Sequence, residues 1–121
     1  MSLETTIIRA ADAQIESFDW GKLQWLVAGR TVAGCEQTFG VSTIGPGLRN
    51  PLHYHPNCEE ILYVASGACE HSYDGATAPL GPGDTIVIPA GVKHNLVNTG
   101  TMDVVCIISF SSSTRETVFL E

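Results

Sequence analysis

Charged side chains are scarce in this sequence. Asp, Glu, Lys and Arg make up 16% of the 121 residues, against about 25% in an ordinary soluble domain. Six of the charged residues are basic and thirteen are acidic, so the net charge at pH 7 is -7. No cluster of Lys and Arg offsets this balance, which repels phosphate backbones and anionic membranes. We therefore expect no nucleic-acid partner.

Long apolar runs are also missing. No stretch approaches the roughly 18 consecutive apolar residues of a membrane-spanning helix. The opening segment MSLETTIIRAADAQ lacks the basic and then apolar pattern of a signal peptide. We expect a cytoplasmic protein without a membrane partner.

The cysteines are few and far apart. Cys35, Cys58, Cys69 and Cys106 never form a Cys-x-x-Cys pair, so neither a zinc knuckle nor a redox pair is indicated. We expect reduced, partly buried thiols.

A helical period is absent between Gly21 and Phe110. Pro and Gly recur at short intervals there and separate runs rich in Val, Ile, Tyr and Thr, which are typical of strands. We expect strands at residues 24–29, 35–44, 52–55, 60–66, 68–73, 85–90, 94–98 and 104–110. Many short strands joined by tight turns predict an antiparallel sandwich or barrel.

The two ends of the chain are less regular. Residues 4–18 fit a helical turn about as well as an edge strand, and both alternatives stay open. The tail, residues 111–121, begins as a serine-rich loop and ends in an apolar TVFL that could return to the sheet. No linker, repeat or low-complexity tract divides the chain, so we expect residues 1–121 to form a single domain.

Three histidines and a glutamate can be brought together by the two-residue period of extended strands. His53 and His55 are separated by one residue, so both rings leave a strand on the same face. Glu60 opens the next strand, and His94 opens another after the turn PAGVK. Imidazole and carboxylate are good ligands for a divalent transition metal, and this set fits iron, manganese, nickel or cobalt better than structural zinc. Four protein ligands in an octahedral shell leave two positions open.

The same residues form two motifs. GLRNPLHYHPNCEEILYVASG, residues 47–67, reads G-x5-H-x-H-x4-E-x6-G, and GDTIVIPAGVKHNLVN, residues 83–98, reads G-x5-P-x-G-x2-H-x3-N. All ten fixed positions resemble the two motifs of the cupin superfamily, in its small single-domain form, the cupin-2 type conserved barrel. The resemblance implies an all-β fold, an antiparallel jelly-roll barrel of two sheets with little or no helix. It also assigns His53, His55, Glu60 and His94 as metal ligands.

Other polar side chains are candidates for substrate contact. His71 shares a strand face with Tyr73, so we expect it to point into the barrel near the metal, where it could shuttle protons or bind a carboxylate. The alternative for His71 is a hydrogen bond at the barrel mouth. Tyr73 could donate a hydrogen bond to substrate, although an aromatic residue on a barrel strand is more often packing. The adjacent carboxylate Glu59 should face solvent, since strand parity turns it away from Glu60.

Two basic residues flank the motifs. Arg49 and Lys93 could attract an anionic substrate, and a solvated surface position is the alternative for both. Trp20 and Trp25 are expected to pack under the barrel or at a subunit contact rather than to bind ligand.

Two functions follow from the resemblance. Similar cupins are dioxygenases, isomerases, decarboxylases and lyases, commonly acting on organic acids or sugar derivatives, which implies a metalloenzyme acting on a small-molecule substrate. The alternative is a binding or sensor module without catalysis. The complete set of four ligands favours the enzyme, because a binder needs a shaped pocket more than an open metal.

The low charge also bears on assembly. The segments EILYVAS and VVCIISF are apolar on both faces, as strands are when both of their faces are covered. We expect an outer sheet face to be buried in a homodimer.

Overall fold

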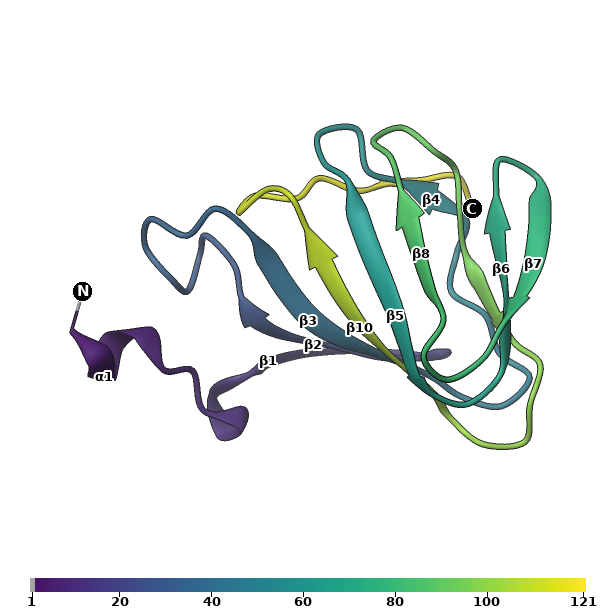
Figure 1. Ribbon diagram of the computed structural model, residues 1–121, viewed down its shortest axis with the longest axis horizontal. Helices are drawn as coiled ribbons and strands as arrows, with labels where there is room; N and C mark the ends of the chain where they lie inside the picture. The colour runs from purple at the N-terminus through teal and green to yellow at the C-terminus, as the bar shows by residue number, and fades with distance from the viewer. Residues whose placement is uncertain (1) are drawn as a thin grey trace.

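The computed structural model describes residues 2–121, and its regular structure is almost entirely β (Figure 1). Two short helical segments come first, α1 (Leu3–Thr6) and the 3-10 turn η1 (Ala10–Asp12). The strands are β1 (Gln14–Phe18), β2 (Gly21–Val27), β3 (Thr38–Ile44), β4 (His53–Tyr54), β5 (Glu60–Ser66), β6 (Cys69–Tyr73), β7 (Ala76–Leu80), β8 (Thr85–Ile88), β9 (Leu96–Asn98), β10 (Val104–Phe110) and β11 (Val118–Phe119). The expected all-β class is confirmed.

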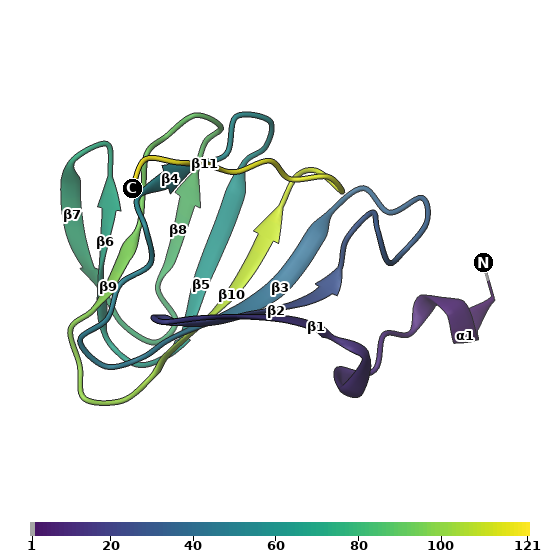
Figure 2. The same ribbon diagram turned by 180° about the vertical axis from the view of Figure 1, so that it is seen from behind.

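The strands form a large sheet that faces smaller ones. The large sheet has the order β1-β2-β3-β10-β5-β8, and the smaller sheets are β7-β6-β9 and β11-β4. All pairings within them are antiparallel. Two isolated antiparallel bridges, Arg49 to Val97 and His53 to His94, connect the segment that contains β4 with the segment that contains β9. Figures 1 and 2 show the large sheet curving beneath these strands, which is the predicted antiparallel jelly-roll barrel.

Most expected strands form where the pattern predicts them. β5 and β10 have the expected bounds. β7 was not expected, because ATAPL contains a proline and only one β-branched residue; it completes a hairpin with β6. At the amino end, residues 4–18 contain both open alternatives, since α1 and η1 precede the edge strand β1. The tail returns as expected, with β11 paired to β4.

Strand alternation builds the core. Along β5, Glu60, Leu62 and Val64 face inward, whereas Ile61 and Tyr63 are exposed on the outer face. The apolar interior is formed by Trp25, Ile44, Cys58, Leu62, Val64, Cys69, Leu96, Val104, Cys106, Ile108 and Phe110. Because Glu60 lies in the same inward register, the core side of the sheet also carries the carboxylate of the metal motif.

Gly67 shows why the first motif ends in glycine. Its φ of 88° lies in the left-handed region, and a Cβ atom there would lie 2.6 Å from the carbonyl oxygen of Asp103. No other residue type fits this turn without displacing the backbone. The glycine therefore fixes the turn between β5 and β6, and with it the path of the strand that carries His71.

The cysteines are free thiols, with Cys58, Cys69 and Cys106 buried and Cys35 partly exposed, as expected. Within residues 2–121, neither helical segment has the length and apolar character needed to cross a membrane.

Candidate metal centre

A backbone pairing brings two of the three clustered histidines together, one from each motif. His53, in β4, and His94, just before β9, lie directly opposite each other in an antiparallel bridge. The amide of His53 donates to the carbonyl of His94 at 3.1 Å, and the amide of His94 donates back at 2.8 Å. Residues paired in this way project their side chains on the same side of the sheet. Their imidazole rings accordingly lie 4.3 Å apart between centroids.

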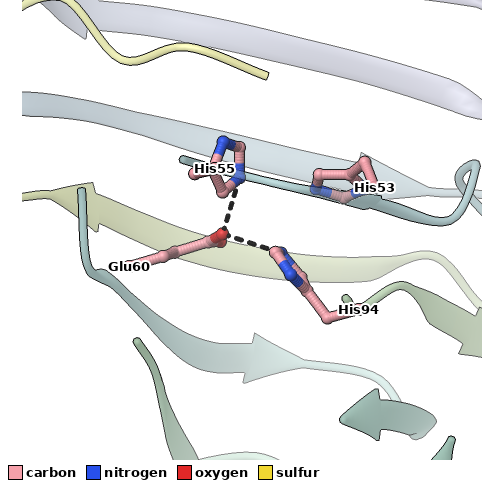
Figure 3. Close-up of side chains that lie close together, drawn as sticks. All are labelled: His53, His55, Glu60 and His94. Atoms are coloured by element: carbon pink, nitrogen blue, oxygen red, sulfur yellow. Dashed lines mark hydrogen bonds and ion pairs between the residues drawn. The ribbon is translucent and has the colours of Figure 1, made fainter. Parts of the chain in front are cut away.

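His55 and Glu60 lie at the two ends of the turn between β4 and β5 and complete the cluster (Figure 3). Glu60 Oε1 lies 3.0 Å from His94 Nε2 and 3.2 Å from His55 Nε2. All four side chains are buried, and their donor atoms lie within 4.8 Å of one another. The structure therefore gathers the four sequence-predicted ligands at one point. Glu59, by contrast, is exposed, as strand parity predicts.

Each histidine ring is oriented by a backbone carbonyl on its Nδ1 side. His53 Nδ1 lies 2.7 Å from Pro51 O, His55 Nδ1 lies 2.9 Å from Glu116 O, and His94 Nδ1 lies 3.0 Å from Val92 O. A carbonyl only accepts, so these contacts place the ring proton on Nδ1 in the neutral imidazole. A neutral imidazole in this tautomer has its lone pair on Nε2, which is the arrangement seen in histidines that bind metals.

The electrostatics of the cluster suit a cation. Burial alone would raise the pKa of Glu60, but the adjacent His55 and His94 rings, whose Nε2 atoms lie 3.2 and 3.0 Å from Oε1, hold it below its usual range. Burial and the neighbouring His94 lower the pKa of His53 to about 4. At pH 7 the carboxylate is thus ionised and His53 is neutral, the forms that a metal requires. The buried His55 Nε2 has no hydrogen-bond partner, as expected of a nitrogen that serves as a ligand. The residues present therefore fit a first-row divalent ion.

The cluster opens onto a cavity of about 360 Å³. One part of its wall is polar and contains the four clustered residues and His71. The remaining wall is largely apolar, and its aromatic members are Phe18, Trp20, Trp25, Phe110 and Phe119. This volume is in the range of small-molecule sites, which combine apolar walls with a few polar groups.

His71 lies where strand parity predicts. Its side chain is 2% exposed, lines the cavity, and stacks nearly parallel to the His94 ring at 5.7 Å between centroids. Burial and the neighbouring His94 lower the pKa of His71 to about 4, so the ring is neutral at pH 7. Its Nδ1 atom is buried without a hydrogen-bond partner. His71 is therefore a polar group of the cavity that stands outside the four-residue cluster.

The other predicted contact residues do not line this cavity. Tyr73 is 39% exposed, because it is the last residue of β6 and extends past the segment that pairs with β9. Lys93 is exposed. Arg49 is also exposed, and its guanidinium pairs with Glu121 at 3.0 Å at the edge of the cavity.

Two aromatic residues belong both to the core and to the cavity wall. Trp25 is a buried member of the apolar core and Trp20 packs against that core, as expected, and both also line the cavity. Phe18, at the end of β1, stacks on Trp20 with 4.7 Å between ring centroids. Their place at the cavity was not predicted, because an alternating pattern gives the face of a strand but not whether that face borders packed side chains or open space.

Arg115 was missed altogether. It belongs to the segment between β10 and β11, which the sequence suggested only as a serine-rich loop. The side chain lines the main cavity and also a smaller one of about 200 Å³, and Trp25 lines both. The sequence signal was a single basic residue in an apolar and serine-rich tail. The tail has no regular hydrophobic spacing that would predict where this side chain points.

Comparisons with known proteins agree with this architecture. The chain is 42% identical over 74 residues to protein SchB of Streptomyces halstedii, covering 60% of this chain and 54% of SchB. It is 36% identical over 80 residues to polyketide synthase CurC of Streptomyces cyaneus, covering 66% of this chain and 52% of CurC. The chain thus spans about half the length of these relatives.

A solved structure shares the fold. The oxalate decarboxylase of Lactobacillus farciminis, in its formate complex, superposes with a TM-score of 0.83 at 22% identity, covering 91% of this chain and 34% of that one. At this identity the likeness concerns the fold alone. The family is given by the sequence itself: residues 40–110, more than half of the chain, match the Cupin_2 model, a cupin domain, and the chain belongs to the cupin family.

Proposed function

We propose that this protein is a metal-dependent enzyme that acts on a small organic acid, with one divalent transition metal held by His53, His55, Glu60 and His94. The observation that carries the proposal is the convergence of these four buried donors on the wall of a cavity large enough for a small molecule. A structural metal site has no need of such a cavity. An isomerase, lyase or dioxygenase reaction is compatible with the ligand set.

The metal, when bound, supplies a Lewis acid that polarises a substrate oxygen. The chain's own residues prepare the site for it. Glu60 offsets part of the cation's charge, and the carbonyls of Pro51, Glu116 and Val92 hold the three rings in place. His71, neutral at pH 7, offers one N–H donor and one acceptor nitrogen to a substrate in the cavity. The apolar wall limits the access of water, which strengthens each of these polar interactions.

The wall also restricts the substrate class. Aromatic rings cover much of the cavity and would leave the hydroxyls of a sugar without partners. A ring-containing or otherwise apolar acid fits better. It is consistent with this choice that the relative CurC is named a polyketide synthase.

The proposal is tested by metal analysis with matched carboxylate variants. The wild type, stripped with chelator and then offered iron, manganese, cobalt, nickel or zinc, is expected to retain about one equivalent of at least one of them. Glu60→Gln should retain less than about a tenth of that amount, whereas Glu59→Gln, whose carboxylate is exposed next to it, should match the wild type. The proposal fails if the wild type takes up none of these metals.

Turnover then separates enzyme from binding module. The metal-loaded protein is offered a panel of aromatic hydroxy and keto acids while oxygen uptake and product formation are followed. Product formation without oxygen uptake indicates an isomerase or lyase, and uptake indicates a dioxygenase. An acid that binds tightly and is never converted would favour the sensor instead.

We propose further that residues 1–121 form one domain, which pairs with a second copy through the outer face of the large sheet. Apolar side chains from four neighbouring strands are exposed on that face: Phe39, Ile61, Tyr63, Val87 and Ile107. The strand registers make them neighbours, since Ile61 pairs with Val87 and Ile107 pairs with Tyr63. A contiguous exposed apolar face on a chain with few charges supports a homodimer.

A further inference from the structure

Arg115 is the cationic side chain of the cavity. The other charged residues that line it are Glu60, within the metal cluster, and Glu121, which pairs with Arg49 at the edge. Arg115 lies among largely apolar groups, and burial lowers the pKa of its guanidinium. The side chain is half-buried, and the loss of hydration is costly for a cation unless other groups compensate for it.

Two aromatic rings hold the guanidinium in place. Its central carbon lies 4.2 Å from the ring centroid of Trp25 and 5.3 Å from that of Phe110. Gly40 of β3 leaves room for the Trp25 side chain. The two residues pair across β2 and β3, and a Cβ atom at Gly40 would lie 2.7 Å from the indole. The rings offset part of the desolvation cost through cation–π contact. The guanidinium carbon lies over both rings, and these contacts occupy none of its N–H groups as hydrogen-bond donors.

Those N–H groups are mostly unused. Within residues 2–121 the side chain makes one hydrogen bond, from Nη1 to Thr117 Oγ1 at 3.3 Å, and its buried Nε has no partner there. Among the described residues, the ion pairs within 4.0 Å involve Arg49, His55 and His94, but not Arg115. A guanidinium has five N–H donors in a geometry that matches a carboxylate. Arg115 therefore has the capacity for an anion that the chain itself does not supply.

The metal cluster is close by. The Phe110 ring that contacts Arg115 also contacts the His55 ring, with 4.9 Å between centroids. Thr117 Oγ1, which accepts from Arg115, lies 3.2 Å from His55 Nδ1. The guanidinium and the cluster thus share two neighbours, and one small molecule in the cavity can reach both.

The charges favour an anion. A divalent ion with the Glu60 carboxylate carries one net positive charge, and Arg115 adds a second. We propose that Arg115 is the anion-binding residue of this cavity: its guanidinium binds a carboxylate of a ring-containing acid whose apolar body lies against the aromatic wall. The inference rests on the proposed function in one respect, that the substrate occupies the same cavity as the metal.

The test compares one ring with and without a charge. The probes are 2-naphthoate and its neutral analogue 2-naphthamide, and their affinities for chelator-treated protein are measured by calorimetry. The wild type should bind the acid about tenfold or more tightly than the amide, as expected for a charge-assisted hydrogen bond. Arg115→Met should reduce this preference to within about twofold, because its side chain keeps the bulk and loses the charge. Arg49→Met removes an exposed arginine at the cavity edge and should keep the full preference.

The outcomes are decisive in each case. A wild type without preference, or an Arg115→Met variant that retains it, overturns the proposal. If Arg115→Met does not fold, Arg115→Lys decides, since it keeps the charge and loses the planar fork. If the preference of Arg115→Lys for the acid over the amide is about threefold or more below that of the wild type, the assignment is supported. If that preference is undiminished, the assignment is overturned. These titrations use metal-free protein. A failure to take up metal would therefore overturn the proposed metalloenzyme without affecting the result for Arg115, and a negative result for Arg115 would leave the proposed metalloenzyme standing.

Discussion

His53 and His94 are held together by two reciprocal backbone hydrogen bonds, of 3.1 and 2.8 Å. The pairing involves no side-chain atom, so it positions both rings whether or not a cation is present. The other two members of the cluster are also positioned by the fold itself, His55 through the contact of its ring Nδ1 with Glu116 O and Glu60 by its place in β5. Unlike a small zinc domain, whose fold depends on its metal, this barrel has an apolar core of its own.

Metal binding should therefore stabilise a chain that is already folded. Chelator-treated protein is expected to keep the circular dichroism spectrum of a β protein. Metal at about a hundred times its Kd should then add about 2.7 kcal/mol to the free energy of unfolding, which raises Tm by about 10 °C. Glu60→Gln should show no such rise. Unfolding on chelation would contradict the preassembled cluster, and so would an unchanged Tm in a wild type that binds metal.

His71 should affect turnover without affecting metal content. It lines the cavity and stacks on His94, but it lies outside the cluster of four donors. His71→Ala is expected to keep the metal content of the wild type and to lower turnover about tenfold or more, the usual size of a lost proton-transfer or hydrogen-bonding group. Elemental analysis and a product assay check both halves. A loss of metal would make His71 a ligand, and unchanged turnover would reduce it to packing.

Acid should destabilise the metal-free protein. His53 and His71 have pKa values lowered to about 4 by burial and by the neighbouring His94, whereas the unfolded chain takes up these protons near pH 6.5. Their contribution to the free energy of unfolding is thus complete above pH 6.5 and is lost as the pH falls to about 4. The loss is about 3 kcal/mol for each group. His94 has the opposite sign: burial opposes its charge, but the hydrogen bond to Glu60 raises its pKa, so its contribution is present at low pH and is lost as the pH rises.

The measurement is urea unfolding of chelator-treated protein from pH 7 to pH 4. The free energy of unfolding should fall with pH, and His71→Gln should remove about half of the fall, because one of the two lowered histidines is gone. A flat profile for the wild type would show that His53 and His71 are not held neutral by burial.

The sequence was most informative where local spacing determines the direction of a side chain. His53 lies on β4, His55 follows that strand directly, and Glu60 opens β5, so parity and motif spacing together predict one site. Tyr73 shows the limit of parity, since the last residue of a strand can share the inward register and still extend past the end of its neighbouring strand, here β9.

Arg115 could not be located in this way, because its position depends on contacts across the whole chain. Its guanidinium lies on Trp25 of β2 and Phe110 of β10, and the tail that carries it is held by the pairing of β11 with β4. None of these contacts imposes a regular hydrophobic spacing on the sequence of the tail. The same reasoning applies to Trp25, whose neighbours include an empty volume that no sequence pattern records.

Assembly should depend on the outer face of the large sheet. Ile107 lies at its middle, paired with Tyr63 on one side and Val41 on the other. The wild type is expected to be a dimer at micromolar concentration by light scattering, and Ile107→Lys a monomer, because a buried unpaired ammonium is costly in an interface. Met102→Lys, which changes an exposed apolar residue outside the strands, should leave the dimer intact. If the wild type is monomeric, the exposed apolar side chains of β5, β8 and β10 are no homodimer interface; if Ile107→Lys remains dimeric, the copies pair through another surface.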